Sequence, residues 1–480
     1  MTNSQYVPTI GIETHVQLKT KTKLFSAVGN DARQAPPNTL ISHIDVGLPG
    51  ALPVLNQAAI ELCARAALAL NTDPQKFSWF ERKHYFYPDL PKGYQITQYQ
   101  APIIKGGFLE IEAGGRTKKI KIERANLEED AGKNIHPAGA DYTLIDLNRA
   151  GTPLLEIVSR PEINSAAEAK AYVRELWLLM KYADVTDGDL YHGHMRFDIN
   201  VSVARAGDKL GTRSEIKNLN SFRSVEAAVA YEIKRQIELL EKGQKVIQET
   251  RGWDEAKQKS VAQRGKEEAE DYRYMPEPDI PPLELTDKFI EDVKAELPKL
   301  PPQLRRQLDK LGIDKKVTED ILDRQSIVKP ILDVLAAGSP ADARRVAFWL
   351  IHAQPAETEK VGIVEPEIDS ARLISLSKMV DGGELSSTAA KAVFDELLSS
   401  PEDPMTIAKR LNLLQVTDTA AIEKIVEEVI TENPKVAEDI KQGEMKAIGF
   451  LVGQVMTKSQ GQANPKVAQE LIKKQLDLVE

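Results

Sequence analysis

An alternating segment near the N-terminus, Ile10 to Leu18, constrains the fold more than any other stretch of the chain. Successive side chains of a β-strand point to opposite faces of a sheet, so Glu13, His15 and Gln17 would share one face and apolar residues the other. A carboxylate beside an imidazole is a good ligand pair for a divalent ion, and a strand holds such a pair rigidly. The alternative is an edge strand whose polar face lies in solvent.

Further carboxylates lie in later segments with strand character. Glu156 belongs to the apolar run Leu154 to Val158, where a charge is unfavourable unless it is paired or bound to a metal. The acidic run Glu128 to Asp130 precedes a glycine. Adjacent carboxylates repel one another unless a cation or solvent relieves them, and a surface turn is the ordinary alternative.

Strands and helices alternate through the first part of the chain. Alternation from Met195 to Val203 predicts a strand, and Arg213 to Asn220, which contains Glu215, predicts a polar-faced strand or turn. Apolar periodicity predicts a helix over 57–70 with Asn56 as its N-cap, and further capped helices over 165–182 and 224–243. Beyond Pro282 the pattern becomes helical with short Pro and Gly breaks.

The segment Ser78 to Gln100 interleaves aromatic residues with cations. This combination suits the stacking of an unpaired base or ribose beside a phosphate, and a tyrosine-rich hairpin packed on a core is the equal alternative. The residues of interest are Tyr85, Tyr87, Lys92 and Tyr94.

Composition excludes several classes of protein. With 480 residues, 42% of them hydrophobic and 28% charged, the chain should form about three globular domains. Its single cysteine, Cys63, excludes disulfides and thiolate zinc sites within one chain. No apolar run has the length of a membrane span and the N-terminus lacks signal-peptide character, so we expect a cytoplasmic protein without a membrane partner. The net charge of −9 argues against nonspecific nucleic-acid binding by the whole surface.

Five long strings of residues resemble the B subunits of the aspartyl/glutamyl-tRNA amidotransferases, in that family's order and nearly end to end. They are Gly11 to Leu18, Phe86 to Ile96, Leu127 to Lys133, Asp146 to Val158 and Asp271 to Asp279. The resemblance implies an α+β protein, with a mixed-sheet cradle domain (1–290), a helical domain (291–405) and a small helical YqeY-like tail (406–480).

The resemblance also implies a magnesium ion in the cradle. Its ligands would be Glu13, His15, Glu128 and Glu156, with Glu129 as the alternative to Glu128 and Glu215 as a further candidate. Hard oxygen ligands with one imidazole suit magnesium or manganese. Family members that bind zinc do so through cysteines in the loop after the first strand, and this loop has none, so no zinc is expected.

The implied reaction is ATP-dependent amidation of the side-chain carboxylate of Glu-tRNA(Gln) or Asp-tRNA(Asn). Phosphorylation makes an acyl phosphate that ammonia can attack, and phosphoryl transfer needs positioning and charge neutralisation. Glu13, His15, Lys92 and Arg149 are therefore the predicted catalytic residues. There is no P-loop, so the nucleotide and substrate would be bound otherwise. The candidates are Tyr85, Tyr87, Lys92, Tyr94, Arg149 and Arg273, and, on position alone, Lys266 and Tyr274.

The implied partners are the amidase (A) subunit of a heterotrimeric amidotransferase, which would supply ammonia, its small (C) subunit, and tRNA(Gln) or tRNA(Asn). Between Asp439 and Leu476 of the tail there are six lysines against three acids, and such a bias suits an RNA backbone. The predicted tRNA-binding lysines are Lys441, Lys446, Lys458 and Lys466. Two alternatives stay open: a stand-alone metal-dependent ligase or hydrolase, and an RNA-binding scaffold whose acidic cluster is structural.

Overall fold

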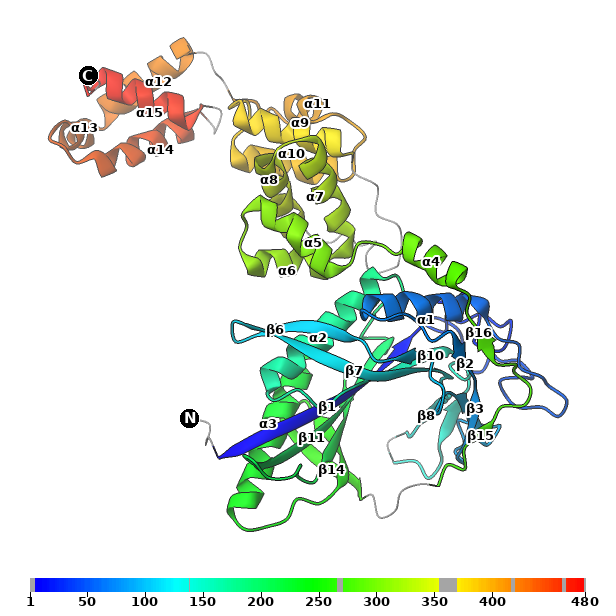
Figure 1. Cartoon of the computed structure of the whole chain (residues 1–480). Helices are drawn as coiled ribbons and strands as arrows, with labels where there is room; N and C mark the ends of the chain where they lie inside the picture. Colours follow the sequence, from blue (N-terminus) through cyan, green and yellow to red (C-terminus); the bar gives the residue numbers. More distant parts are fainter. Residues whose placement is uncertain are drawn as a thin grey trace. The chain divides into compact units, whose positions relative to one another are not determined.

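The computed structural model describes residues 5–137, 139–265, 271–353, 369–415, 419–459 and 463–478. Its chain forms two compact units, Met1–Pro301 and Pro302–Glu480 (Figure 1). The first is built on a mixed β-sheet and the second is helical. The predicted α+β class is therefore confirmed at this level, whereas the division into three domains stays a prediction.

The first unit is organised around a nine-stranded sheet. The strand order is β14-β13-β12-β11-β1-β10-β7-β5, and β6 pairs with β7 off this path. Neighbours are antiparallel except β12 and β13, which are parallel. The strands are β1 (Tyr6–Gln17), β5 (Ile104–Lys105), β6 (Phe108–Ala113), β7 (Arg116–Glu129), β10 (Pro153–Ser159), β11 (Met195–Arg205), β12 (Ser214–Leu219), β13 (Glu249–Asp254) and β14 (Lys259–Gly265).

The predicted alternation of β1 is confirmed. Ile10, Ile12 and Val16 are buried, and they lie on the face covered by helices α2 (Ala166–Tyr182) and α3 (Phe222–Glu241). Phe222 of α3 contacts Phe197 of β11 across this layer, with 6.3 Å between ring centroids. The helices therefore seal the apolar face and leave the opposite face of the sheet to the polar residues.

Strand β7 contains a bulge that decides which of its residues reach the polar face. Val158 of β10 pairs with Arg124 while Ser159 pairs with Ile122, which leaves Glu123 as an extra residue. A bulge of this kind interrupts the two-residue alternation of faces. Ile122 therefore points to the apolar side, whereas Arg124 and every second residue after it point to the polar side.

Three smaller sheets and two helices complete the first unit. Helix α1 (Gln57–Ala69) begins at the predicted cap Asn56, whose side chain accepts a hydrogen bond from Ala58 N (3.0 Å). Helix α4 spans Asp287–Glu296. The small sheets are β15 (Met275–Pro276) with β3 (Glu81–His84) and β4 (Tyr94–Thr97), β16 (Leu283–Glu284) with β2 (Phe77–Ser78), and β8 (Lys133–Ile135) with β9 (Leu144–Asp146).

The second unit consists of short helices, several of which begin at side-chain caps. Ser339, for example, forms a reciprocal capping box with Asp342 at the start of α8. The helices are α5 (Pro301–Leu308), η1 (Asp309–Leu311), α6 (Lys315–Asp323), α7 (Gln325–Ala337), α8 (Pro340–His352), α9 (Ser370–Asp381), α10 (Ser387–Leu397), α11 (Pro404–Arg410), α12 (Thr419–Glu432), α13 (Pro434–Lys441), η3 (Met445–Ala447), α14 (Ile448–Lys458) and α15 (Pro465–Gln475).

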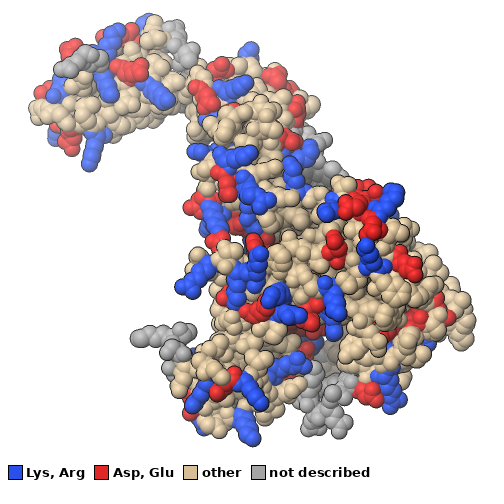
Figure 2. All heavy atoms as spheres, viewed as in Figure 1, with Lys and Arg blue, Asp and Glu red and all other residues tan. Residues whose placement is uncertain are grey.

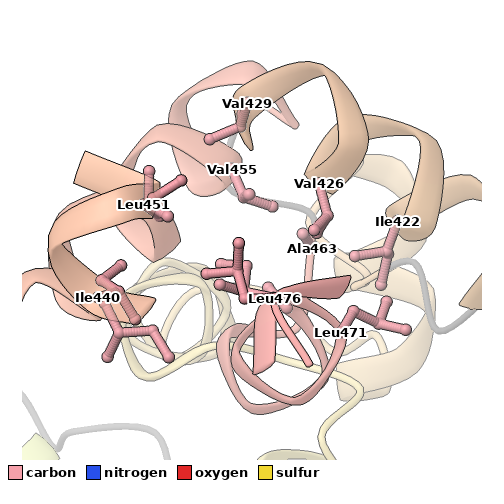
Figure 3. Close-up of a cluster of buried hydrophobic side chains, with 13 residues drawn as sticks. Ile422, Val426, Val429, Ile440, Leu451, Val455, Ala463, Leu471 and Leu476 are labelled. Atoms are coloured by element: carbon pink, nitrogen blue, oxygen red, sulfur yellow. The ribbon is translucent and has the colours of Figure 1, made fainter. Parts of the chain in front are cut away.

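Helices α12 to α15 share a hydrophobic core of their own (Figure 3). Val426 of α12, Leu451 of α14 and Ile472 of α15 are completely buried in it. Across the described parts of the chain, no helix combines the length and the hydrophobicity that a membrane span requires. Figure 2 shows Lys and Arg interspersed with Asp and Glu on the visible face of both units, so neither presents a broad field of one sign there.

Candidate metal centre

The register of the main sheet brings Glu13, His15 and Glu156 together. His15 of β1 pairs directly with Glu156 of β10, and Glu13 lies two residues before His15 on the same face. His15 Nε2 is 3.9 Å from Glu13 Oε1 and 4.0 Å from Glu156 Oε1. One ligand atom from each of the three residues lies within 4.8 Å of the others, and no other such group occurs among the described residues.

The protonation of this cluster fits a cation site. Burial and the neighbouring Glu156 carboxylate raise the pKa of Glu13 to about 9. Burial opposes ionisation of Glu156 too, but its hydrogen bonds with Glu13 and Asn126 lower its pKa to about 2. The two carboxyl groups therefore share a proton. Burial also lowers the pKa of His15, which favours the neutral imidazole that metals bind.

Strand β7 places Glu128 and Glu129 on different sides of the sheet. Glu128 lies on the polar face, where it accepts a hydrogen bond from Thr97 Oγ1 (2.8 Å), and burial and Glu156 raise its pKa to about 8. Glu129 instead forms a buried ion pair with Lys92 and accepts a hydrogen bond from Ile96 N (2.9 Å). Geometry therefore favours Glu128 over Glu129 as a ligand. Both residues belong to β7, which ends at Glu129, and not to a surface turn.

Asn126 adds an oxygen that the sequence interpretation overlooked. Its Nδ2 donates to Glu156 Oε2 (2.7 Å), while its buried Oδ1 has no hydrogen-bond partner among the described residues. An orphaned amide oxygen is a hard ligand. Together with Glu13, His15 and Glu156 it forms a donor set that fits magnesium or manganese.

Charged pairs flank the cluster along the polar face. On one side Arg196 donates to Asp130 (2.8 Å), and Arg149 Nε lies 3.5 Å from the same carboxylate. These arginines outweigh the effect of burial and lower the pKa of Asp130. On the other side Lys217 Nζ lies 2.8 Å from Asp198 and 3.5 Å from Glu215, so the candidate Glu215 is already paired.

The loop between β1 and α1 is anchored beside Arg149 by a buried lysine. Lys23 Nζ donates to Leu40 O and Ala150 O, both at 2.6 Å, and lies 3.4 Å from Asp45. Ser26 Oγ donates to the same carboxylate (3.2 Å). The absence of zinc from this loop stays a prediction.

The predicted nucleotide residues do not all gather at the cluster. Tyr85 faces Glu128, and burial and that carboxylate raise the pKa of its hydroxyl. In the small sheet, Tyr94 lies on the face opposite to Lys83 and Gln95, where the guanidinium carbon of Arg82 is 4.3 Å from its ring centroid. Tyr87 and Arg273 are exposed. Lys266 lies outside the described residues.

The tail lysines differ in their environment. Lys458 pairs with Glu428 (3.1 Å) and Glu432 (2.6 Å), which neutralise its charge. The other three predicted tRNA-binding lysines are exposed: Lys441, Lys446 and Lys466.

Comparison with known proteins defines the class of this chain. Residues 8–291 match the family model of the GatB/GatE catalytic domain, and residues 333–476 match that of the GatB domain. The chain belongs to the GatB/GatE family.

Full-length relatives agree with this assignment. The chain is 42% identical over 481 residues to the B subunit of the aspartyl/glutamyl-tRNA(Asn/Gln) amidotransferase of Carboxydothermus hydrogenoformans, covering 98% of this chain and 99% of that protein. It is 45% identical over 478 residues to the B subunit from Geobacter sulfurreducens, covering 98% and 99%. The corresponding protein of Coxiella burnetii is 44% identical over 480 residues, covering 98% and 100%.

Proposed function

We propose that this chain, as the B subunit of a tRNA-dependent amidotransferase, activates the side-chain carboxylate of Glu-tRNA(Gln) or Asp-tRNA(Asn) at the Glu13, His15 and Glu156 cluster. The observation that carries the proposal is the convergence of these residues on one sheet face, with a shared proton and an orphaned oxygen beside them. Relatives named as this component of the enzyme cover nearly the whole chain.

The proposed reaction has two steps. An oxygen of the substrate carboxylate attacks the γ-phosphorus of ATP, and ADP leaves, which forms an acyl phosphate. Ammonia then attacks the acyl carbon and inorganic phosphate leaves, giving the amide. Magnesium bound by Glu13, His15, Glu156 and Asn126, with Glu128 close by, would neutralise charge on the phosphoryl oxygens.

The chain's own residues have positioning roles in this scheme. Arg149 and Arg196 hold Asp130 at one end of the polar face. Lys92, predicted as catalytic, is paired with Glu129, so we assign it the support of β7 behind the cluster. Ammonia would come from the amidase (A) subunit in a complex that also contains the small (C) subunit, and the exposed tail lysines would contact the tRNA.

The experiment is ATP consumption by the assembled complex, with and without magnesium and misacylated tRNA. Glu13→Ala and Glu156→Gln should abolish tRNA-dependent consumption, whereas Glu110→Gln, an exposed carboxylate on β6, should leave it unchanged. Full turnover in both cluster variants would refute the metal assignment. Turnover without an amidase partner would favour the stand-alone ligase, and tRNA binding without nucleotide hydrolysis would favour the scaffold.

A further inference from the structure

A continuous ledge of four tyrosine rings borders the carboxylate cluster. Tyr99 and Tyr274 stack with 4.3 Å between ring centroids. The centroids of Tyr274 and Tyr272 are 6.1 Å apart, and those of Tyr272 and Tyr85 are 6.3 Å apart. Burial raises the pKa of the Tyr274 hydroxyl, and the nearby Glu156 and Glu128 carboxylates raise it further, which places the ledge over the polar face. In order, the ledge consists of Tyr85, Tyr272, Tyr274 and Tyr99.

Lys83 lies at one end of the ledge and faces the cluster. It pairs with Gln95 across β3 and β4, so both side chains share one face of that small sheet. Gln95 Nε2 donates to Glu129 O (2.7 Å), which places this face against the end of β7. The ammonium of Lys83 lies 4.6 Å from the Tyr272 ring centroid and 5.7 Å from that of Tyr85.

Arg124 lies at the other end, on the polar face of β7. Its guanidinium carbon is 5.5 Å from the Tyr99 ring centroid. Its Nε is buried and has no hydrogen-bond partner among the described residues. A buried donor without an acceptor is costly, so this atom is poised for an acceptor that a ligand supplies.

Lys83 and Arg124 differ in their pairing from the lysines around the cluster. Lys92 is neutralised by Glu129, and Lys217 by Asp198 and Glu215. Within the described part of the chain, Lys83 and Arg124 form no ion pair, and each lies over an aromatic ring. Their charges are therefore available to a polyanion, which an acidic cluster would otherwise repel.

We propose that Lys83 and Arg124 bind the polyphosphate of the nucleotide beside the metal centre, with the tyrosine ledge supporting both side chains. This inference rests on the proposed function and adds the phosphate-binding residues that the metal cluster itself does not supply.

The test measures direct binding to the full chain assembled with its partner subunits. The probes are Mn²⁺ alone, a non-hydrolysable ATP analogue with Mn²⁺, and AMP with Mn²⁺. Lys83→Met and Arg124→Met should each weaken binding of the ATP analogue about tenfold or more, because a charge-assisted hydrogen bond is lost. Binding of AMP, which lacks the outer phosphates, should weaken less in these variants. Lys83→Arg should retain most of the affinity for the ATP analogue. Lys119→Met is the matched control, since Lys119 also lies over a ring, Phe108 (4.5 Å), on the same strand as Arg124 but in the hairpin.

Binding of Mn²⁺ alone distinguishes a phosphate-binding role from a structural one. Removing a positive charge near carboxylates should leave Mn²⁺ affinity unchanged or increase it. A parallel loss of Mn²⁺ and nucleotide affinity in Lys83→Met and Arg124→Met would overturn the inference, as would wild-type affinity for the ATP analogue in both. If the wild-type complex bound no analogue in the presence of Mn²⁺, the proposed function would fall together with this inference.

Discussion

Replacing Lys92 by methionine tests whether this lysine supports the sheet or acts on the substrate. The side chains of Lys92 and Glu129 are only 6% and 3% exposed, and the Glu129 carboxylate also accepts a hydrogen bond from Ile96 N. Removing one partner of a buried ion pair costs about 3–5 kcal/mol, because the remaining charge is left uncompensated. For a unit of this size we expect the unfolding temperature to fall by about 5–10 °C.

A double-mutant cycle separates the ion pair from other effects of the substitution. The double variant Lys92→Met with Glu129→Gln has no buried charge, and its amide oxygen can still accept a hydrogen bond from Ile96 N. Its free energy of unfolding should therefore exceed that of Lys92→Met by about 2 kcal/mol or more. Thermal unfolding of the full chain, followed through the transition of the first unit, measures each variant. Lys76→Met is the matched control: it breaks an ion pair with Asp287 that is 63% and 79% exposed, and should change stability by less than about 1 kcal/mol.

The result that refutes this reasoning is a coupling energy below about 0.5 kcal/mol between the two positions. ATP consumption adds a second readout. If the double variant regains both stability and activity, Lys92 has the positioning role that we assign to it. If stability returns and activity does not, Lys92 contacts the substrate, as the sequence pattern suggested.

Three further predictions concern the metal, pH and tRNA. Magnesium or manganese should raise the unfolding temperature of the wild-type chain, because it relieves repulsion in the cluster, and should not do so in Glu156→Gln; equal shifts in both would place the ion elsewhere. Burial lowers the pKa of His194 below its ordinary value of 6.5, so the unfolded chain binds the extra proton and stability should fall as the pH drops below 6.5. His194→Gln should reduce the fall of the unfolding temperature between pH 7 and 5, and an unchanged slope would contradict this account. Replacing the three exposed tail lysines by alanine should reduce the slope of log K for tRNA binding against log salt concentration by about two to three. Lys458→Ala should change this slope little, because the charge of Lys458 is already paired. A larger effect of Lys458→Ala than of the triple replacement would be inconsistent with the ion pairs. The three are Lys441, Lys446 and Lys466.

Local patterns predicted those parts of the fold that depend on neighbours in sequence. The alternation of β1 put Glu13 and His15 on one face, and Asn56 marked the start of α1. The charge of Glu156 in an apolar run indicated that a partner was needed, and the structure supplies His15 and Asn126. Each of these inferences required only the periodicity of one element.

The site residues that could not be predicted depend on contacts between distant strands. Lys83 faces the cluster because β3 and β4 lie against the end of β7, and nothing in its local sequence distinguishes it from Lys92. The choice between Glu128 and Glu129 depends on strand pairing in the same way, since both stand in one acidic run. Asn126 is a candidate because its Oδ1 is buried and finds no hydrogen-bond partner among the described residues, which depends on the packing of β7 against β10.

Because β7 contains a bulge, a change in the length of this strand has different effects at the bulge and beyond it. Deleting Glu123 would remove the bulge and let Arg124 follow Ile122 directly, so regular alternation would return while Glu128 kept its place on the polar face. Deleting or adding a residue at the Gly114 and Gly115 turn would leave this register intact. Deletion of Glu123 should therefore be tolerated better than insertion of one residue after Leu127, which would turn Glu128 to the opposite face and should reduce ATP consumption by the complex.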